Sequence, residues 1–131
     1  METVHRPIPA ELEAVVSDCI GAAVAVHREL GPGFKELIYQ RAFCLELDSR
    51  GLNYECEKPV MVRYRNWTIP GQRLDLVVAD GVLIEIKAVP RITDEDHRQV
   101  LSYLKTTGLR VGLLFNFQAR LLRDGLRRFV V

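Results

Sequence analysis

The 131-residue sequence predicts an α/β fold, with a mixed central sheet flanked by helices in the element order ααβββαββ. Two observations predict this class. Three segments repeat apolar residues every three to four positions, as amphipathic helices do, and five others are apolar at alternate or at successive positions, as strands are. No internal repeat, low-complexity stretch or linker separates these segments, so we expect a single domain over residues 1–131.

The first two elements are expected to be helices. Apolar residues follow at helical spacing from Leu12 to Leu30, and Gly31-Pro32-Gly33 ends the first pattern. A second pattern continues to Gly51, where a helix commonly ends with positive φ. Its predicted buried face comprises Phe34, Ile38, Ala42 and Leu45, widened by Leu37, Cys44 and Leu47. This breadth predicts that the second helix is more buried than the first.

A long hairpin is expected next. Alternation from Leu52 to Tyr64 predicts a half-buried strand that is broken near Lys58-Pro59. Arg65-Asn66 can turn the chain, with positive φ expected at the asparagine. The returning strand begins at Trp67 and is expected to be interrupted at Pro70-Gly71.

The remaining elements surround a third helix. Residues 73–78 and 82–89 are apolar at nearly every position, which is typical of strands covered on both faces. We expect Thr93 to cap a helix that ends at Gly108, because acidic residues occupy its first turn. Residues 111–117 then predict a buried strand, 118–125 a connection and 126–131 a short last strand.

Composition narrows the class of protein. Lysine and arginine exceed aspartate and glutamate by one, and 48% of the residues are apolar, as in a soluble domain. No stretch is apolar for the ~18 residues of a membrane span, and the first residues lack the apolar region of a secretion signal, so we expect a cytoplasmic protein without a membrane. The three cysteines form no CxxC and predict buried, reduced thiols.

Charge is concentrated at one end of the sequence. Residues 97–131 carry seven lysines and arginines and a single acid, Asp124, whereas residues 1–96 are acidic. A basic segment of this kind suits a polyanionic partner such as nucleic acid, and it equally fits a solvated surface.

Three charged residues interrupt the apolar hairpin strands, namely Asp75, Glu85 and Lys87. Isolated charges in an apolar layer cost several kcal/mol unless they are paired or bind a metal. A two-residue loop at Asp80-Gly81 would send the two carboxylates to opposite faces. A three-residue loop that begins at Ala79, with positive φ at the glycine, places them opposite each other, with Cβ atoms about 5 Å apart. We expect this second register, which also places Arg73 opposite Lys87.

Two carboxylates so placed can hold Mg²⁺ or Mn²⁺, which polarises a phosphoryl oxygen and lowers the pKa of a bound water. Lys87 can orient that water, or it can form an ion pair that serves only stability. Glu36, with Tyr39 on the same helix face, can add a third carboxylate or simply favour the helix dipole. Gln99 and Tyr103, one helical turn apart, can bind the water or a phosphate, or be merely exposed.

These residues lie in blocks that resemble the small bacterial and archaeal GxxExxY proteins, a branch of the PD-(D/E)XK nuclease superfamily. The naming motif is Gly33-Phe34-Lys35-Glu36-Leu37-Ile38-Tyr39. Further blocks follow in family-like order, among them Arg73-Leu74-Asp75, Glu85-Ile86-Lys87, Gln99-Val100-Leu101-Ser102-Tyr103 and Asn116-Phe117. The likeness extends from about Leu12 to Val131.

The resemblance implies a restriction-endonuclease-like core and a Mg²⁺- or Mn²⁺-dependent phosphodiesterase that acts on DNA or, failing that, on RNA. It implies that Asp75 and Glu85 ligate the metal, that Glu36 is a further acid and metal ligand, and that Lys87 and Gln99 complete the catalytic set. Substrate contacts would come from Tyr39, Arg73, Tyr103 and Lys105. The small size of the chain leads us to expect a homodimer with a longer groove for nucleic acid.

The sequence departs from the family at two positions. A histidine often precedes the glutamine by three residues, but Asp96 stands there and His97 lies about 100° further around the helix, so we expect a structural or exposed histidine. Gln118 stands where glycine is frequent.

Two other function classes are alternatives to a nuclease. A catalytically idle nuclease fold used for nucleic-acid binding or assembly remains the alternative, although such a module has no physical reason to keep Asp75, Glu85 and Lys87 in an apolar sheet. A small-molecule enzyme has little support, because the sequence lacks a Gly-rich phosphate loop, a Ser-His-Asp order and an HExxH motif.

Overall fold

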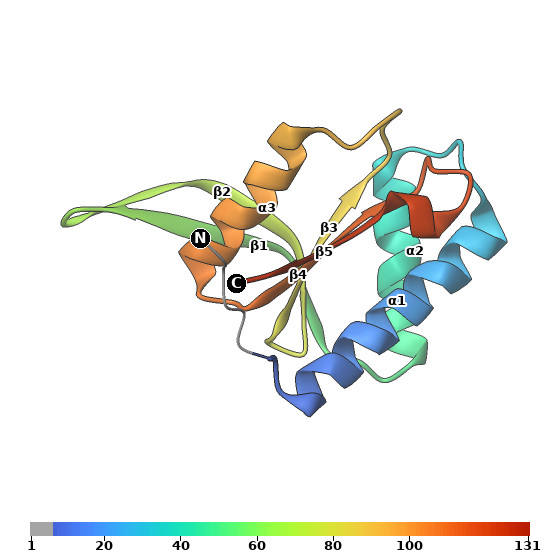
Figure 1. Cartoon of the computed structure of the whole chain (residues 1–131), viewed down its shortest axis with the longest axis horizontal. Helices are drawn as coiled ribbons and strands as arrows, with labels where there is room; N and C mark the ends of the chain where they lie inside the picture. The colour runs from blue at the N-terminus through green and yellow to red at the C-terminus, as the bar shows by residue number, and fades with distance from the viewer. Residues whose placement is uncertain (1–6) are drawn as a thin grey trace.

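The computed structural model describes residues 7–131 and contains one five-stranded sheet in the order β1-β2-β3-β4-β5 (Figure 1). Residues 1–6, over which we expect no secretion signal, lie outside the described residues. The elements are α1 (Ala10–Leu30), α2 (Glu36–Ser49), β1 (Tyr54–Tyr64), β2 (Trp67–Val78), β3 (Val82–Lys87), α3 (Asp94–Thr107), β4 (Val111–Asn116), the 3₁₀ turn η1 (Leu122–Gly125) and β5 (Leu126–Val130). The predicted order of helices and strands is confirmed.

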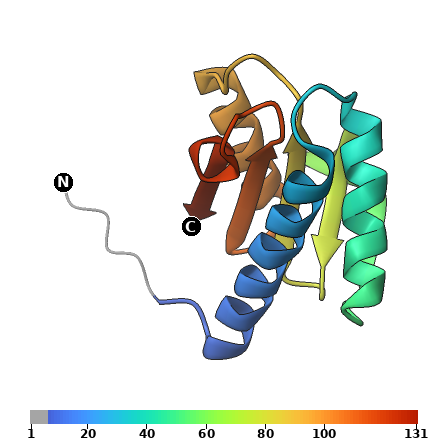
Figure 2. The same ribbon diagram turned by 90° about the vertical axis from the view of Figure 1, so that its right-hand side faces the viewer.

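The sheet is mixed, as predicted. β3 and β4 run parallel, and the other three neighbouring pairs are antiparallel. Buried side chains form two clusters, one joining α1 and α2 to the sheet and the other joining α3 to it. Figure 2 shows α1 and α2 side by side in front of the strands, with α3 behind them. No helix among residues 7–131 is both long and apolar enough to cross a lipid bilayer.

The buried face of α2 differs from the prediction. Tyr39, Phe43 and Leu47 are fully buried, whereas four of the predicted residues are exposed, namely Phe34, Leu37, Ile38 and Leu45. Tyr39 stacks on Phe117 with ring centroids 4.7 Å apart, and Phe43 packs 5.8 Å from Phe115. Apolar residues surround this helix on several sides, and the aromatic rings of β4 and its extension select the side that packs. α2 buries three residues and α1 buries five, so the predicted ranking of their burial is wrong.

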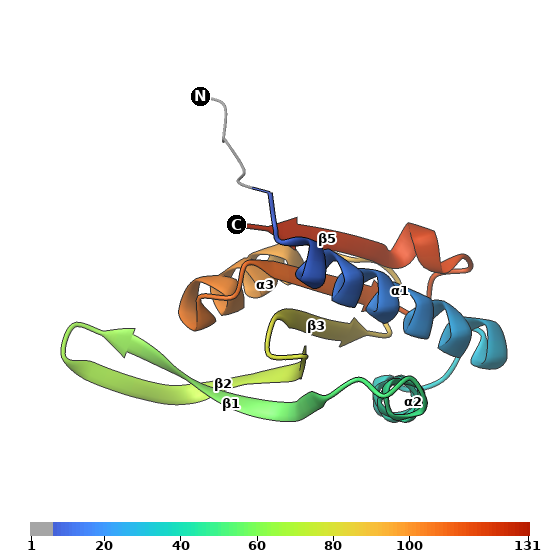
Figure 3. The same ribbon diagram turned by 90° about the horizontal axis from the view of Figure 1, so that it is seen from below.

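The β1–β2 hairpin is long and continuous, and the two predicted interruptions do not end its strands. Instead, the register shifts between Val60 and Val62, opposite Pro70-Gly71, and Gly71 adopts a φ of 127°. Such a β-bulge bends and twists a hairpin without ending it. At the tip, positive φ falls on Arg65 at 53° and not on Asn66. Figure 3 shows the outer end of this hairpin projecting beyond the helices.

The turn between β2 and β3 decides how the acidic residues are placed. Val78 pairs with Val82, so the predicted three-residue loop is confirmed. Positive φ occurs at Ala79 and Asp80, however, and not at Gly81 as predicted. A Cβ at Gly81 would lie 2.6 Å from Cδ1 of Leu12 in α1, so this turn packs closely on that side chain. The loop is therefore held directly against the first helix.

The cysteines are free thiols, but they are not all buried. Cys19 is buried, Cys44 is half-buried and Cys56 is exposed. The Sγ atoms of Cys44 and Cys56 lie 3.0 Å apart, linking α2 to β1 by a thiol contact. Burial was expected for all three, and Cys56 escapes it because β1 is the edge strand of the sheet.

Candidate active site

The two central hairpin strands separate at the acidic residues. Their pairing ends at Leu76 and Ile84, in the register that brings Asp75 next to Glu85. Beyond this pair, the backbone N–H of Ile86 donates to Oδ2 of Asp75 at 2.8 Å. The Asp75 carboxylate thus takes the place of the β2 backbone carbonyl to which an N–H of β3 would donate in a continued ladder. The backbone pairing of β2 and β3 therefore ends where the Asp75 side chain lies between the two strands.

Glu85 is a buried carboxylate with an unsatisfied oxygen. Its residue is 6% exposed, and Oε2 has no hydrogen-bond partner among residues 7–131. Burial, followed by the neighbouring charge of Asp75, raises the pKa of Glu85 to about 8. Burial also raises the pKa of Asp75, although the Ile86 N–H and Lys87 oppose this shift. The two carboxyl groups are thus poorly accommodated as a pair of anions and favour either a shared proton or a cation.

Lys87 extends from the end of β3 between two acids. Its Nζ lies 3.9 Å from Oε1 of Glu85 and 3.7 Å from Oδ1 of Asp96, and it donates to Oε1 of Gln99 at 3.4 Å. The backbone N–H of Phe117 donates to the Lys87 carbonyl at 2.9 Å, which fixes the strand end. The ammonium group is therefore positioned from both β3 and α3.

Asp96 is a site residue that the sequence reasoning missed. As predicted, Thr93 caps α3, and Asp96 completes a capping box by accepting from the Thr93 N–H at 2.9 Å. The other oxygen of Asp96 faces Lys87, so the same carboxylate fixes the helix start and the ammonium group. Its position one turn before Gln99 was the available signal. His97 turns elsewhere and meets the ring of Phe129 edge-on, as a structural histidine does.

Glu36 begins α2 with an exposed carboxylate. Partial burial and the charge of Asp75 raise its pKa, while Lys87 lowers it, which places Glu36 within electrostatic reach of the acid pair. Gln118 holds the preceding loop, because its Oε1 accepts from the Gly33 N–H and its Nε2 donates to the Phe34 carbonyl, both at 3.0 Å. This departure from the family thus has a structural role near the start of α2.

Tyr39 does not face a substrate. It is fully buried, and its hydroxyl donates to the Gly31 carbonyl at 2.5 Å while accepting from the Phe34 N–H at 3.1 Å. The predicted substrate contact is therefore wrong for this residue. The tyrosine instead closes the loop between α1 and α2, because its hydroxyl satisfies two backbone groups of that loop.

The other predicted contact residues lie at different depths. Tyr103 is 6% exposed, and burial followed by the charges of Glu85 and Asp75 raises its pKa, which places it within electrostatic reach of the acid pair. Arg73 is exposed and forms an ion pair with Glu57 at 3.9 Å. Its expected place opposite Lys87 lies beyond the end of the β2–β3 pairing. Lys105 is exposed on α3 and lines a groove beside β1.

A second missed residue, Asn116, supports the strand end that carries Lys87. Its side chain accepts from the Val89 N–H at 3.1 Å and donates to the Val89 carbonyl at 2.9 Å. The asparagine is buried at the end of β4, directly opposite Lys87 in the parallel pair. A polar residue that ends an otherwise apolar strand was the signal for this role.

The family follows from the sequence match and agrees with this geometry. A family model described as the PD-(D/E)XK nuclease superfamily matches residues 13–129. The chain belongs to this superfamily. Its mixed sheet and three helices form a restriction-endonuclease-like α/β fold. No curated protein and no solved structure matched the chain.

PD-(D/E)XK nucleases generally use divalent metal ions. Within residues 7–131, no three His, Cys, Asp or Glu side chains are arranged as a metal site, so the expected trio of Asp75, Glu85 and Glu36 is not assembled. Asp75 and Glu85 nevertheless fit a hard cation, because both are buried acids and Glu85 has an oxygen without a partner. Mg²⁺ is commonly held by one or two carboxylates, with water and substrate phosphate completing the shell.

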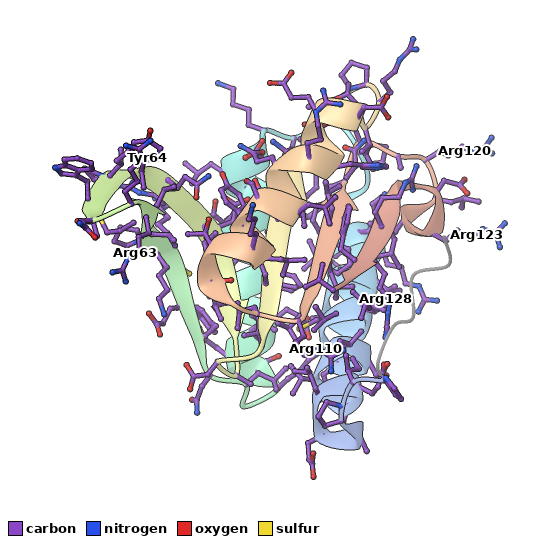
Figure 4. The ribbon with its side chains drawn as sticks, turned by 60° about the vertical axis from the view of Figure 1, so that its left-hand side comes forward. Arg63, Tyr64, Arg110, Arg120, Arg123 and Arg128 are labelled. Atoms are coloured by element: carbon purple, nitrogen blue, oxygen red, sulfur yellow. The ribbon has the colours of Figure 1, made fainter. Side chains whose placement is uncertain are left out.

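The basic C-terminal segment does not converge on the acid pair. Arg128 pairs with Glu13 of α1, and Arg127 donates to the Asp124 and Leu126 carbonyls. Figure 4 shows Arg120, Arg123 and Arg128 on the side of the molecule away from Arg63 and Tyr64. The charge asymmetry of the sequence is therefore spread over several surfaces when the chain folds.

Proposed function

We propose that this chain is a metal-dependent nuclease of the GxxExxY branch that hydrolyses phosphodiester bonds of DNA, with RNA as the alternative substrate. The observation that carries this proposal is the buried Glu85 carboxylate, which has an unpartnered oxygen beside Asp75 and Lys87. Burying a second acid here costs stability unless a cation is gained. An arrangement with this cost fits a site kept for chemistry.

Each side chain has a role in this proposal. Asp75 and Glu85 would hold Mg²⁺ or Mn²⁺, which when bound supplies a Lewis acid for the phosphoryl oxygen and acidifies a water. The Lys87 ammonium, held by Gln99 and by the Asp96 charge, orients the attacking water and stabilises charge that develops on the phosphate oxygens.

Glu36 and Tyr103 complete the proposed set. Glu36 is exposed, and its raised pKa suits it to accept the proton that the water loses, or to bind the cation through water. The Tyr103 hydroxyl lies within electrostatic reach of the acid pair and can donate to a phosphate oxygen. Hydrolysis then breaks one P–O ester bond, and the water oxygen remains on phosphorus.

A cleavage panel tests this function. We would incubate the whole chain with Mg²⁺ or Mn²⁺ and duplex, single-stranded, flapped or branched DNA, and with RNA. We expect cleavage of at least one substrate by the wild type and its loss in Lys87→Ala and Glu85→Gln. Activity that persists in both variants, or that is absent on every substrate with either metal, would contradict the proposal.

A control variant tests whether the loss of any carboxylate, and not only of one in the site, affects cleavage. Glu29→Gln removes an exposed carboxylate from α1 and should leave cleavage unchanged. Isothermal titration of Mn²⁺ into wild type and into the Asp75→Ala, Glu85→Ala double variant provides an independent readout. Equal binding by both proteins would exclude the carboxylate pair as the metal site.

A homodimer is part of the proposal because the chain is small for a nucleic-acid groove. The exposed apolar residues of α2, among them Leu37 and Leu45, offer a surface that a second copy can cover. Sedimentation velocity should show a dimer, and Leu45→Glu should dissociate it. A monomer at every concentration would remove this part of the proposal and leave the active site untouched.

A further inference from the structure

The outer part of the β1–β2 hairpin, residues 61–69, forms an arm that projects from the body of the molecule (Figures 1 and 3). Its large apolar side chains are exposed, with Trp67 at 63%, Met61 at 57%, Tyr64 at 55% and Ile69 at 49%. Exposed apolar groups gathered in this way mark an interaction surface more often than chance. The core does not explain them, because none belongs to either buried cluster.

The tip of the arm combines flat aromatic rings with cations. The Tyr64 and Trp67 rings lie 6.4 Å apart at an interplanar angle of 20°, and the Arg65 guanidinium sits 5.4 Å from the Tyr64 centroid. Arg63 reaches around the turn and donates from Nε to the Arg65 carbonyl at 3.5 Å. From residue 58 to residue 72 there are three cationic side chains and no aspartate or glutamate.

A groove joins the arm to α3. Its volume is about 390 Å³, and Arg63, Gln72, Ser102 and Lys105 are among its lining residues. Cations therefore face it from both sides, and within the described part of the chain Oε1 of Gln72 is buried there without a hydrogen-bond partner. The groove lies on the two elements that also carry site residues, since Gln72 shares β2 with Asp75 and Ser102 shares α3 with Tyr103.

We propose that the arm and this groove bind an unpaired stretch of a nucleic-acid strand. Bases stack on Tyr64 and Trp67, while Arg63 and Lys105 hold the phosphates across the groove. Stacking of this kind needs an open base face, which a closed duplex does not offer. The inference rests on the proposed nuclease function, which makes the bound strand a substrate. It adds to that function a preference for single-stranded over duplex nucleic acid.

Charge favours nucleic acid over a second copy of the chain as the occupant. Two arms that met would bring two uncompensated cationic tips together, which is unfavourable at ordinary ionic strength. A polyanion supplies the opposite charge, and its bases match the exposed rings. The arm thus has both parts of a single-strand site, a stacking surface and a cationic track.

Trp67 provides a direct test because it is the only tryptophan of the chain. Wild type in EDTA would be titrated with 15-nucleotide oligo(dT), 15-nucleotide oligo(rU) and a 15-base-pair duplex, with tryptophan emission recorded. We expect single strands to quench the emission and to bind at least about tenfold more tightly than the duplex. The two oligonucleotides show whether the site takes DNA, RNA or both.

Variants locate the binding. Tyr64→Ala should weaken single-strand binding by about 5- to 100-fold, and Arg63→Ala should reduce the slope of log K against log salt by about one. Trp67→Ala, followed by anisotropy of a labelled strand, should behave like Tyr64→Ala. Leu121→Ala removes an exposed apolar side chain from the start of η1, outside both the arm and α2, and should leave binding unchanged.

Three outcomes would overturn the inference. They are equal affinity for duplex and single strand, unaltered binding by Tyr64→Ala and Trp67→Ala, and a sedimentation shift showing that these two variants only abolish self-association. The assay uses neither metal nor turnover, so it is separable from the cleavage panel. Binding by the arm without cleavage would remove the proposed function alone, whereas cleavage with an inert arm would remove this inference alone.

Discussion

Strand β2 belongs to two regions that differ in almost every property. Its inner end, from Leu74 to Val78, lies in the buried sheet, whereas its outer end, from Trp67 to Gly71, is exposed and includes the returning side of the arm. The inner region contains few charges, each held by specific neighbours, and the outer region shows aromatic rings and arginines to solvent. The same strand thus links a buried group of acids with an exposed surface suited to binding nucleic acid. Asp75 lies near the boundary between the buried and the exposed part of β2.

The largest expected difference between the two regions is in turnover. Lys87→Ala should lower cleavage by on the order of a thousandfold, because in the proposed mechanism it removes the charge that stabilises the developing phosphate oxyanion. Arg65→Ala in the arm should raise KM and leave kcat within about twofold, since it alters binding of the substrate and its transition state equally. Single-turnover kinetics separate the two effects. A fall in kcat for Arg65→Ala would show that the regions are not separable.

The pH dependence of stability should originate in the inner region. The folded pKa of Glu85 is raised to about 8 from an ordinary value of 4.5, so the folded state keeps a proton that the unfolded chain has lost. The free energy of unfolding in EDTA should therefore be fully preserved below about pH 4.5, fall as the pH rises toward 8 and level off above it. Urea titrations at several pH values measure this slope.

Two controls sharpen that test. Glu85→Gln cannot ionise and should flatten most of the slope. Mg²⁺ should restore stability to the wild type at pH 8 but not to the variant, because a ligand that binds only the folded state stabilises it. A slope that is unchanged in Glu85→Gln would place the titration elsewhere.

A small deletion in the buried body should lower the free energy of unfolding more than a large deletion in the arm. Tyr39→Phe deletes a hydroxyl that satisfies the Gly31 carbonyl and the Phe34 N–H, and should lower the free energy of unfolding by about 1–3 kcal/mol. Trp67→Ala deletes a much larger group but should cost less than about 1 kcal/mol, because the ring is exposed and contributes only a cross-strand pair. Thermal and urea unfolding compare them. The reverse ranking would mean that the arm stabilises the fold.

A smaller loss of turnover than that of Lys87→Ala is expected at Asp96. Asp96→Asn keeps an amide oxygen for the Thr93 N–H but removes the charge facing Lys87, so α3 should remain folded while kcat falls by about 10-fold through misplacement of the ammonium group. Circular dichroism and the pH profile of kcat separate these roles. Asp96→Ala should lose both activity and helix stability. Full activity in Asp96→Asn would reduce Asp96 to a helix cap.

Local patterns predicted most of the elements, and they failed where several packings were equally compatible. The Thr93 cap and the Gly108 end of α3 depend on neighbouring residues alone, and both were confirmed. The buried face of α2 was wrong because its apolar residues surround the helix, and only the rings of Phe115 and Phe117 select a side. Pro70-Gly71 produced a bulge instead of a break because β1 continues to pair across it.

The candidate site was predictable to the same extent. Asp75, Glu85 and Lys87 were recognisable because charges in apolar strands are rare, and the short loop at Gly81 fixed their register. Asp96 was not recognisable, because an aspartate in a first helical turn is explained equally well by capping. Its second contact depends on where α3 meets the end of β3.

By itself, the sequence determined the order of helices and strands and the family, because these depend on periodicity and motifs along the chain, and it reduced the β2–β3 turn to two loop lengths. Only the tertiary structure decided that Glu85 is left with a buried, unpartnered oxygen, that Asp96 faces Lys87 and that the arm stands clear of the body. Burial and proximity between distant segments produce these features. Both are properties of the packed chain and have no signature in any single stretch of it.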